Sequence, residues 1–427
     1  MVIDEMLRKL DSYKYANRRQ RAYYEGRYST PLGFSVPPEL KFFASPMDWP
    51  RTIVDVLDER MNIVSLGDDS ADEFAAGIGF ENLYHQAHIE AFIHGISYMV
   101  LTPAVADSPL DIRIASPLDM TGEFDNRGVL KWAISRMAED TIVVYTLDEI
   151  VEYRRDRGGW VKRGGMVNVS ARLNGAQPVI PFVNQPRPGN PYGASEITRA
   201  IRGHCDSAVR TMAAMEANRE FNSGKAYAIL GVDPDEVKGK FRAGIDSIWA
   251  LDRDNSGDLP QIQELSPSSP MPYIDQINLL ARTVASAAAI PESYLGVSTS
   301  NPTSAEAINA SEVRLVRRAA RRQAGFSHCW GAFTQAVTGV YRSPVWEAPE
   351  TPTLAATADA VSKLAGSGII PAGSPVLLDM LHVPPRDRAG IDDARAEDEA
   401  RITTLAAQSL QASDAALAQV EKTRHDL

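Results

Sequence analysis

The second half of the chain contains a helix–β–helix order that strongly limits how it can fold. Between Ser195 and Asn222, apolar residues recur at steps of three and four, which predicts one uninterrupted amphipathic helix. At 1.5 Å per residue, such a helix is about 40 Å long. A second helical pattern covers 273–290 and ends at Pro291. Short β-type runs occupy 226–265, so we expect two antiparallel helices with a small β module at their far end.

Residues 1–190 predict a mixed α+β domain. The helical patterns lie at residues 3–25, from Pro50 onward and at 80–96. The acidic run Gly67–Glu73 is interpreted as a loop. After the third helix, β-type runs alternate with turns, and the turns include Gly158-Gly159 and Gly164-Gly165.

The last third of the chain predicts helices. A polar loop, Gly296–Ser304, precedes a long helical pattern that continues to about Tyr341. Two shorter helical patterns, 353–365 and 374–381, follow. From Ile391 an Ala-rich polar segment with acidic residues in its first turns predicts a final helix.

The charge balance excludes one class of DNA-binding protein. Among 427 residues, 44 Lys and Arg stand against 55 Asp and Glu, and the formal net charge is −11. Proteins that wrap duplex DNA need clustered positive charge to displace its counterions. Cys205 and Cys329 are too few for a disulfide framework, so we expect a reducing, cytoplasm-like setting. The sequence shows no pattern of a signal peptide or a membrane span, so we expect no membrane partner.

No motif predicts catalysis, a cofactor or a bound metal. P-loop, G-x-S-x-G and H-E-x-x-H patterns are absent from the sequence. The spacing of His85, His88 and His94 favours structural histidines over ligands. The run Asp252–Asp258 resembles the opening of a calcium loop, but the closing glutamate is one residue late, so an Asx/Gly turn is preferred.

Five arginines have a regular helical spacing in the predicted helix that starts near residue 305. Their positions, i, i+3, i+4, i+7 and i+8, predict one shared face. These residues are Arg314, Arg317, Arg318, Arg321 and Arg322. We expect this face to pair with acidic neighbours, including those of another subunit, in preference to DNA.

Several phrases resemble the portal proteins of long-tailed bacteriophages, particularly those that infect actinobacteria. The phrases occur in the same order along residues 20–345. They are Tyr23–Gly26, Leu32–Phe34, Trp49–Arg60, Gly193–Arg199, Met215–Phe221, Ile290–Gly296 and Asn301–Ile308. The tail beyond residue 350 contains none of these phrases and resembles the family only in its general character.

The resemblance implies a homo-oligomeric ring, usually of twelve subunits, at one vertex of the capsid of a virion. The ring would assemble in the host cytoplasm. Double-stranded DNA would pass non-specifically through its channel. The implied protein partners are terminase, the head-completion or adaptor proteins, and the major capsid and scaffolding proteins.

The resemblance also implies an α+β portal fold with named parts. These are an α/β wing (1–192), stem helix 1 (193–222), a small α/β clip (223–270), stem helix 2 (271–290), a tunnel-loop region (291–304), a long wing helix (305–346), and a crown with a C-terminal helix (347–427).

Two sets of residues follow from this assignment as candidates for contact with DNA. The tunnel-loop candidates are short, uncharged and polar, which suits contact without anchoring; they are Ser298, Thr299, Ser300, Asn301 and Thr303. The candidates that face the channel from the stem are Arg199, Arg202, Arg210 and Arg219. Pairing of the stem arginines with Asp206, Glu216 or Glu220 is an equally open interpretation.

Two other classes of protein remain as alternatives. A capsid shell or scaffolding protein would form shells or dissociate instead of closing into rings. A DNA-processing packaging enzyme would need a P-loop or an acidic metal site, and the sequence shows the pattern of neither.

Overall fold

The computed structural model describes residues 3–32, 36, 38–103, 110–222, 226–230, 261–265, 269–297, 305–350, 354–371, 374–381, 391, 400–405 and 408. The chain divides into two compact units, Met1–Pro349 and Glu350–Leu427. Each unit is described by itself.

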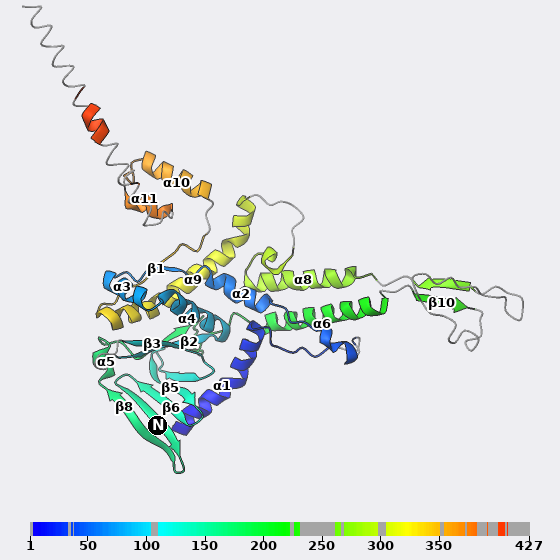
Figure 1. The fold of residues 1–427 in the computed structure, drawn as a ribbon, viewed down its shortest axis with the longest axis horizontal. Coiled ribbons are helices and arrows are strands. Elements are labelled where there is room, and N and C mark those ends of the chain that lie inside the picture. Colours follow the sequence, from blue (N-terminus) through cyan, green and yellow to red (C-terminus); the bar gives the residue numbers. More distant parts are fainter. Residues whose placement is uncertain are drawn as a thin grey trace, which may run out of the picture. The chain divides into compact units, whose positions relative to one another are not determined.

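Helices and two β-sheets build the first unit (Figure 1). Its helices are α1 (Ile3–Tyr24), η1 (Pro38–Phe43), α2 (Trp49–Asp58), α3 (Asp69–Gly77), α4 (Phe80–His94), α5 (Val169–Arg172), α6 (Arg199–Asn222), α8 (Met271–Ala288), η2 (Glu292–Leu295) and α9 (Ala305–Thr338). The structure confirms the two helices predicted around the β-type interval. In Figure 1, α6 and α8 lie side by side and run in opposite directions.

The strands form two sheets and two isolated pairs. The strands are β1 (Ile63–Ser65), β2 (Ile96–Thr102), β3 (Asp111–Ala115), β4 (Met120–Phe124), β5 (Leu130–Ala138), β6 (Thr141–Thr146), β7 (Glu149–Asp156), β8 (Gly159–Val167), β9 (Val179–Val183), β10 (Ala226–Leu230), β11 (Gln261–Leu265) and β12 (Val345–Trp346). One sheet has the order β3-β2-β9 and the other is the antiparallel meander β4-β5-β6-β7-β8. The pairs are β1-β12 and β10-β11, both antiparallel.

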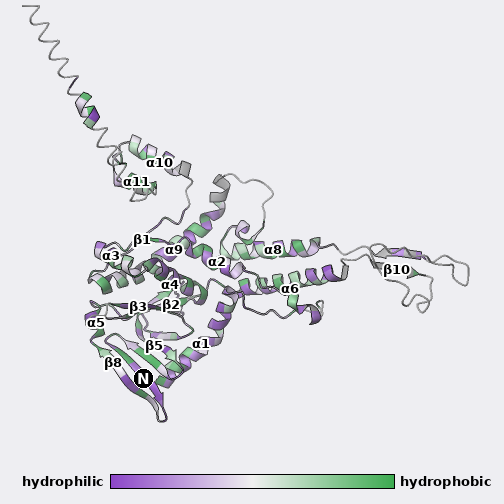
Figure 2. Cartoon of the chain, viewed as in Figure 1, coloured by the Kyte–Doolittle hydropathy of each residue, from purple (hydrophilic) through white to green (hydrophobic). Residues whose placement is uncertain are grey.

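Aromatic side chains of α9 form the centre of the largest hydrophobic core. Trp330 is fully buried, and its ring packs against Phe182 of β9 and Phe80 at the start of α4. The indole Nε1 donates a hydrogen bond of 3.1 Å to Nε2 of His88. Through these contacts, the long helix α9 holds α4 and the three-stranded sheet together. Figure 2 shows a further contrast, between the largely hydrophilic α1 and the largely hydrophobic α8.

The interpretation of Gly67–Glu73 as a loop is wrong, because most of this run lies in α3. The Asp68 side chain caps the helix and accepts hydrogen bonds from the backbone N–H groups of Ser70 and Ala71, at 3.1 and 3.2 Å. Acidic residues in a first turn also favour the positive end of a helix. Ala71 and Ala75 provide its buried side.

The predicted turn at Gly164-Gly165 is also wrong, because both glycines lie inside β8. Gly165 pairs with Val151 of β7, and a Cβ there would lie 3.0 Å from the carbonyl oxygen of Ile150. The missing side chain thus permits a close strand approach instead of a turn. The turn at Gly158-Gly159 is confirmed, since β7 ends at Asp156 and β8 begins at Gly159.

The second unit contains two described helices, α10 (Leu354–Gly366) and α11 (Pro375–Met380). Both agree with the predicted helical patterns. Residues 400–405 are helical, and most of the predicted final helix lies outside the described residues. The Asp252–Asp258 turn lies outside them as well.

Two histidines of α4 are buried and should make stability depend on pH. Burial lowers the pKa of His88, and burial together with the charge of Arg21 lowers the pKa of His94 to about 3, from an ordinary 6.5. Glu90 lies 3.5 Å from Nε2 of His94. Below pH 6.5 the unfolded chain binds protons that these folded rings bind only at lower pH, so stability falls as the pH falls from 6.5.

We expect the variant His94→Gln to reduce this pH dependence. The wild-type free energy of unfolding should fall by at most about 1.4 kcal/mol per pH unit for each ring between pH 6.5 and 5, and the variant should lose one ring's share of that slope. Urea denaturation at several pH values measures the slope. His204→Gln, at a partly exposed position on α6, is the control; an unchanged slope in His94→Gln would contradict the prediction.

Candidate functional site

The root of α6 is a short irregular segment that requires glycine at its first position. Gly193 has φ +68°, in the left-handed region that favours glycine. A Cβ at this position would overlap the carbonyl oxygens of Asn184 and Gly95. The chain after β9 can therefore approach the end of α4 only with glycine here, which accounts for the first residue of the phrase Gly193–Arg199.

Hydrogen bonds hold the rest of this segment before α6 begins. The backbone N–H of Glu196 donates to the carbonyl oxygen of Phe92 at 2.8 Å, and that of Ile197 donates to Oγ of Ser195 at 3.0 Å. The Thr198 hydroxyl accepts from the N–H of Ile201 at 3.3 Å. The helix expected from Ser195 therefore begins at Arg199, because the Ser195 hydroxyl closes a turn onto Ile197 before the helix and Thr198 caps its first turn.

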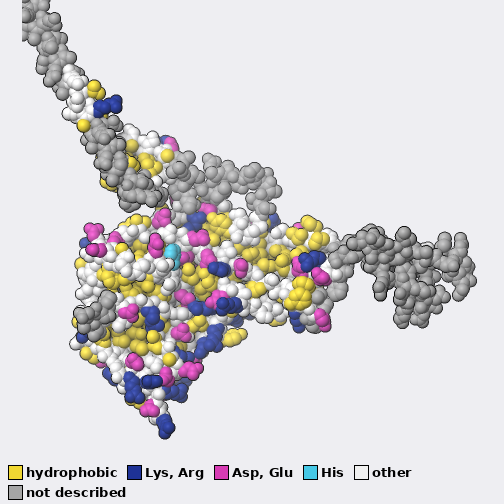
Figure 3. Space-filling model, in the orientation of Figure 1, with side chains coloured by type: hydrophobic (Ala, Val, Ile, Leu, Met, Phe, Trp, Pro, Cys, Tyr) yellow, Lys and Arg dark blue, Asp and Glu magenta, His cyan; other side chains and the backbone are white. Residues whose placement is uncertain are grey.

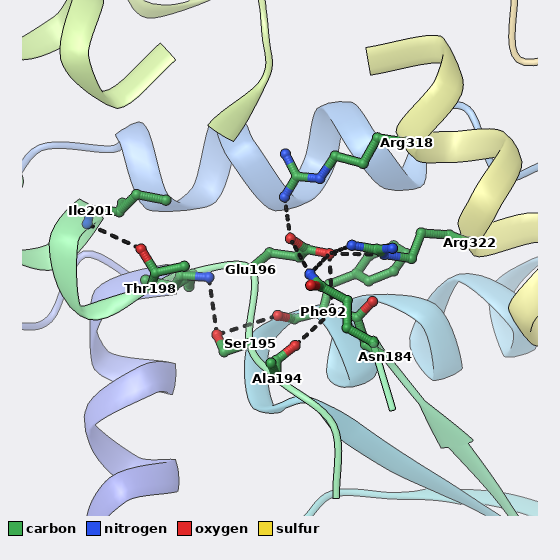
Figure 4. Close-up of polar contacts among 11 residues, drawn as sticks. Phe92, Asn184, Ala194, Ser195, Glu196, Thr198, Ile201, Arg318 and Arg322 are labelled. Carbon is green, nitrogen blue, oxygen red and sulfur yellow. Dashed lines mark hydrogen bonds and ion pairs between the residues drawn. The ribbon is translucent and has the colours of Figure 1, made fainter. Parts of the chain in front are cut away.

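Glu196 is a buried carboxylate at the centre of this root (Figure 4). Its side chain is 2% exposed. Arg322 donates to Oε1 from Nε at 3.0 Å and from Nη2 at 2.8 Å, and Nη2 of Arg318 donates to Oε2. Nδ2 of Asn184 donates to Oε1 at 3.0 Å. One carboxylate thus joins the root of α6, the end of β9 and two successive turns of α9.

The charge of Glu196 is stabilised by its partners. Burial alone would raise the pKa of this carboxyl, but the charges of Arg318 and Arg322 outweigh burial and hold the pKa below its ordinary value of 4.5. Stability from this cluster is therefore present above pH 4.5 and is lost as the pH falls through the lowered value.

The predicted shared arginine face of α9 is divided by the fold. Arg318 and Arg322 turn inward to Glu196 of the same chain, with side chains 15% and 9% exposed. Arg314, Arg317 and Arg321 are exposed. The expectation of one face of five is corrected because Glu196, from a distant segment, supplies a buried counter-charge on one side of the helix only.

A second buried ion pair involves the segments that flank the candidate tunnel loop. Arg60 at the end of α2 pairs with Glu312 of α9 at 3.1 Å, and Glu312 also accepts a hydrogen bond from the hydroxyl of Tyr294. Tyr294 belongs to η2, directly before the loop. Val297, the last described residue before it, is 5% exposed. The candidates Ser298, Thr299, Ser300, Asn301 and Thr303 lie outside the described residues.

The stem arginines of α6 have different surroundings. Arg219 pairs with Glu216 at 2.8 Å and Glu220 at 3.3 Å. Arg210 is exposed and donates to the Ser207 hydroxyl at 2.9 Å. Figure 3 shows blue and magenta side chains mixed on the visible face. The open alternative of pairing within the helix is thus observed for Arg219.

The other two stem arginines, Arg199 and Arg202, lie at the start of α6 beside α1. Arg199 is exposed. Arg202 donates to the side chain of Gln20 and to the carbonyl oxygen of Ile197. Asp206, one of the acidic partners considered above, instead accepts hydrogen bonds from the hydroxyls of Tyr23 and Thr30. Arg19 of α1, which the sequence reasoning missed, borders the same region.

The α6–α8 pair is packed through small side chains. Ala208, Ala213 and Ala217 of α6 are buried, as are Ala281 and Ala285 of α8. Small residues let two helices approach closely. Other apolar side chains of α8 remain uncovered: Met271, Ile274 and Leu279 are 55%, 38% and 63% exposed.

The described part of the chain shows no cluster of metal-binding side chains. No group of three or more His, Cys, Asp or Glu side chains in it is arranged to hold a metal ion. His85 and His88 instead face Asp58, at 2.7 and 3.7 Å. None of the described helices combines the length and apolar character that a bilayer span needs.

Comparison with known proteins identifies the family of this chain. Residues 22–376 match the family described as "Phage portal protein, SPP1 Gp6-like". The portal protein of Mycobacterium phage D29 is 31% identical over 409 residues, which are 86% of this chain and 82% of the relative. The portal protein of Mycobacterium phage L5 is 30% identical over 437 residues, which are 92% of this chain and 85% of the relative.

A solved structure supports the fold alone. A chain from the "Virion of native gene transfer agent (GTA) particle" has a TM-score of 0.50 and 13% sequence identity, covering 87% of this chain and 94% of that one. The chain has a mixed helix and sheet fold of this kind. It belongs to the phage portal protein family, which confirms the resemblance found in the sequence.

Replacement of Gly193 should destabilise the root of α6. We expect Gly193→Ala to lower the free energy of unfolding by at least about 2 kcal/mol, because left-handed backbone and steric overlap add. Gly203→Ala is the matched control: it lies within α6, where a Cβ meets nothing within 4 Å, so it should gain about 0.5–1 kcal/mol. Urea denaturation followed by circular dichroism measures both, and equal effects would contradict the assignment.

Removal of the buried carboxylate should be more costly. We expect Glu196→Ala to lower the free energy of unfolding at pH 7 by about 3–5 kcal/mol, because two buried guanidinium groups lose their counter-charge. The control Glu59→Ala, at an exposed position, should change stability by no more than about 0.5 kcal/mol. A loss in Glu196→Ala as small as that of the control would show that the cluster contributes little.

Proposed function

We propose that this chain forms a closed ring at one vertex of a phage capsid and provides the channel through which double-stranded DNA is packaged and ejected. The observation that carries the proposal is the antiparallel α6–α8 pair, whose two roots are both tied to α9: Glu196 before α6 by buried ion pairs, and Tyr294 after α8 by a hydrogen bond to Glu312. A helix pair fixed at its base is suited to forming a channel wall. Membership of the portal family supports this assignment.

Exposed apolar side chains of α8 support ring formation. Met271, Ile274 and Leu279 lie on one helix of an otherwise well-packed pair. Apolar side chains exposed in this way are typical of surfaces that a partner covers. In the proposed ring, the α6–α8 pair of the neighbouring copy covers them. The number of copies is twelve in this proposal.

Polar and charged candidates take separate roles in the ring. The uncharged residues 298–303 face DNA as a tunnel loop, held at one end by η2 and at the other by α9. Arg314, Arg317 and Arg321, which are exposed on α9, face an adjacent subunit. Arg210 is the stem candidate for DNA, whereas Arg219 already has two carboxylate partners.

The remaining parts of the proposal concern location and partners. The ring belongs to the virion and assembles in the host cytoplasm, among major capsid and scaffolding proteins. Its outer end docks terminase during packaging and head-completion or adaptor proteins afterwards. The chain itself performs no catalysis in this proposal.

Electron microscopy of the purified protein tests the ring. We expect negative-stain images of closed rings with a central hole and about twelve subunits, because closure of a ring would cover the exposed apolar side chains of α8. Closed shells would favour a capsid shell protein. Monomers that remain single at high concentration would contradict the proposal.

A shortened tunnel loop tests the channel separately. Deletion of residues 299–302 should leave rings intact and lower the yield of DNA-filled capsids, because the narrowest part of the channel is lost. The control is a four-residue deletion, 156–159, at the tip of the β7–β8 hairpin in the five-stranded sheet. Intact rings with unchanged packaging and DNA retention would sink the tunnel-loop assignment.

A further inference from the structure

A depression between α1 and α6 gathers positive charge at the start of the stem helix. Its volume is about 380 Å³. We call it the arginine pocket; its lining residues are Arg19, Tyr23, Arg199, Arg202, Gly203 and Asp206. Three guanidinium groups thus share a concave site with one carboxylate.

The single carboxylate is already engaged. Oδ1 of Asp206 accepts hydrogen bonds from the Tyr23 hydroxyl at 2.8 Å and from the Thr30 hydroxyl at 2.9 Å. Among the described residues, the ion pairs made by arginines of α1 and α6 involve Arg21 and Arg219. None of them joins the three arginines of the pocket to a carboxylate.

The position of the pocket makes the positive charges of its arginines less favourable. Arg199 and Arg202 lie in the first turn of α6, whose exposed N–H groups already make that end positive. Burial and then the charge of Arg19 lower the pKa of Arg202, and Arg199 adds to the effect. Like charges brought together in this way are unfavourable in the isolated chain and favourable only when an anion is bound.

The geometry of Arg202 is fixed in advance. Its guanidinium donates to the side chain of Gln20 and, at 2.9 Å, to the carbonyl oxygen of Ile197. Its central carbon lies 5.8 Å from the centre of the Tyr23 ring. A guanidinium held by its neighbours loses little freedom when it binds a carboxylate.

We infer that the arginine pocket receives a carboxylate side chain from the neighbouring copy of the chain and so joins adjacent subunits. The inference rests on the proposed ring. Each copy carries a formal net charge of −11, so adjacent copies repel unless opposite charges meet at their contact. A ring interface uses two different flanks of the same chain, which allows a basic pocket on one flank to meet an acidic side chain of the other.

A neighbouring carboxylate fits this site better than DNA does. Three guanidinium groups in a recess would hold a phosphate firmly and make every passing phosphate a bound one. A channel through which DNA slides is better lined by exposed, sparse charge. A subunit contact, in contrast, gains from firm binding.

The test uses the full-length protein and two exposed arginines. In Arg19→Gln and Arg199→Gln, we expect circular dichroism unchanged, because both side chains are exposed, and an about tenfold lower fraction of protein in rings at low NaCl, where charges are least screened. Light scattering after size exclusion and negative-stain images give that fraction. Arg187→Gln, at an exposed arginine outside the pocket, is the control and should match the wild type.

Three outcomes overturn the inference or the function beneath it. Variant rings as abundant at low NaCl as wild-type rings overturn the inference alone. Intact variant rings that lose only duplex DNA in a mobility-shift assay overturn it and assign the pocket to DNA. Wild-type protein that never forms rings overturns the proposed function as well.

A reconstruction of the wild-type ring decides the chemistry directly. We expect an Asp or Glu side chain of the neighbouring copy within about 4 Å of at least one of the three guanidinium groups. A pocket that faces the channel or bulk solvent in the ring contradicts the inference.

Discussion

One buried carboxylate determines how the parts of the first unit are joined. Glu196 lies at the root of α6 and binds two guanidinium groups from successive turns of α9. A charge in this position is stable only when all its partners are present, because each group left alone would be a buried, unpaired ion. The strand β9, the root of α6 and the middle of α9 therefore form one rigid junction.

The same long helix carries a second junction of similar chemistry. Glu312, toward the start of α9, pairs with Arg60 and accepts a hydrogen bond from Tyr294, which follows α8. Each of the two paired helices is thus connected to α9 close to its own root, α6 by the ion pairs of Glu196 and α8 by the hydrogen bond of Tyr294 to Glu312. An acidic chain uses its few interior arginines where segments distant in sequence must keep a fixed relation.

Helix periodicity predicted α6, α8 and α9 because each buries a regular apolar face against its neighbours. It misplaced the start of α6, since the contact of Glu196 with Phe92 keeps Ser195 out of the helix, which Thr198 then caps. The acidic run at α3 predicted a loop because its density of charge hid the capping role of Asp68. The division of the α9 arginines and the pocket that includes Arg19 depend on contacts between distant segments, which spacing along one helix does not contain. The sequence alone indicated the family and the absence of enzyme motifs, whereas the tunnel-loop assignment stays a prediction.

The cluster around Glu196 also restricts how related sequences can diverge. A lineage that replaces the glutamate leaves two arginines without a counter-charge, and a lineage that replaces one arginine weakens the hold on the glutamate. Neutral drift at any one of these positions is therefore blocked, and substitutions among Glu196, Arg318 and Arg322 are expected to be inherited together. Exposed Arg314, four residues before Arg318 on the same helix, is free of that constraint and can vary with the surface it meets.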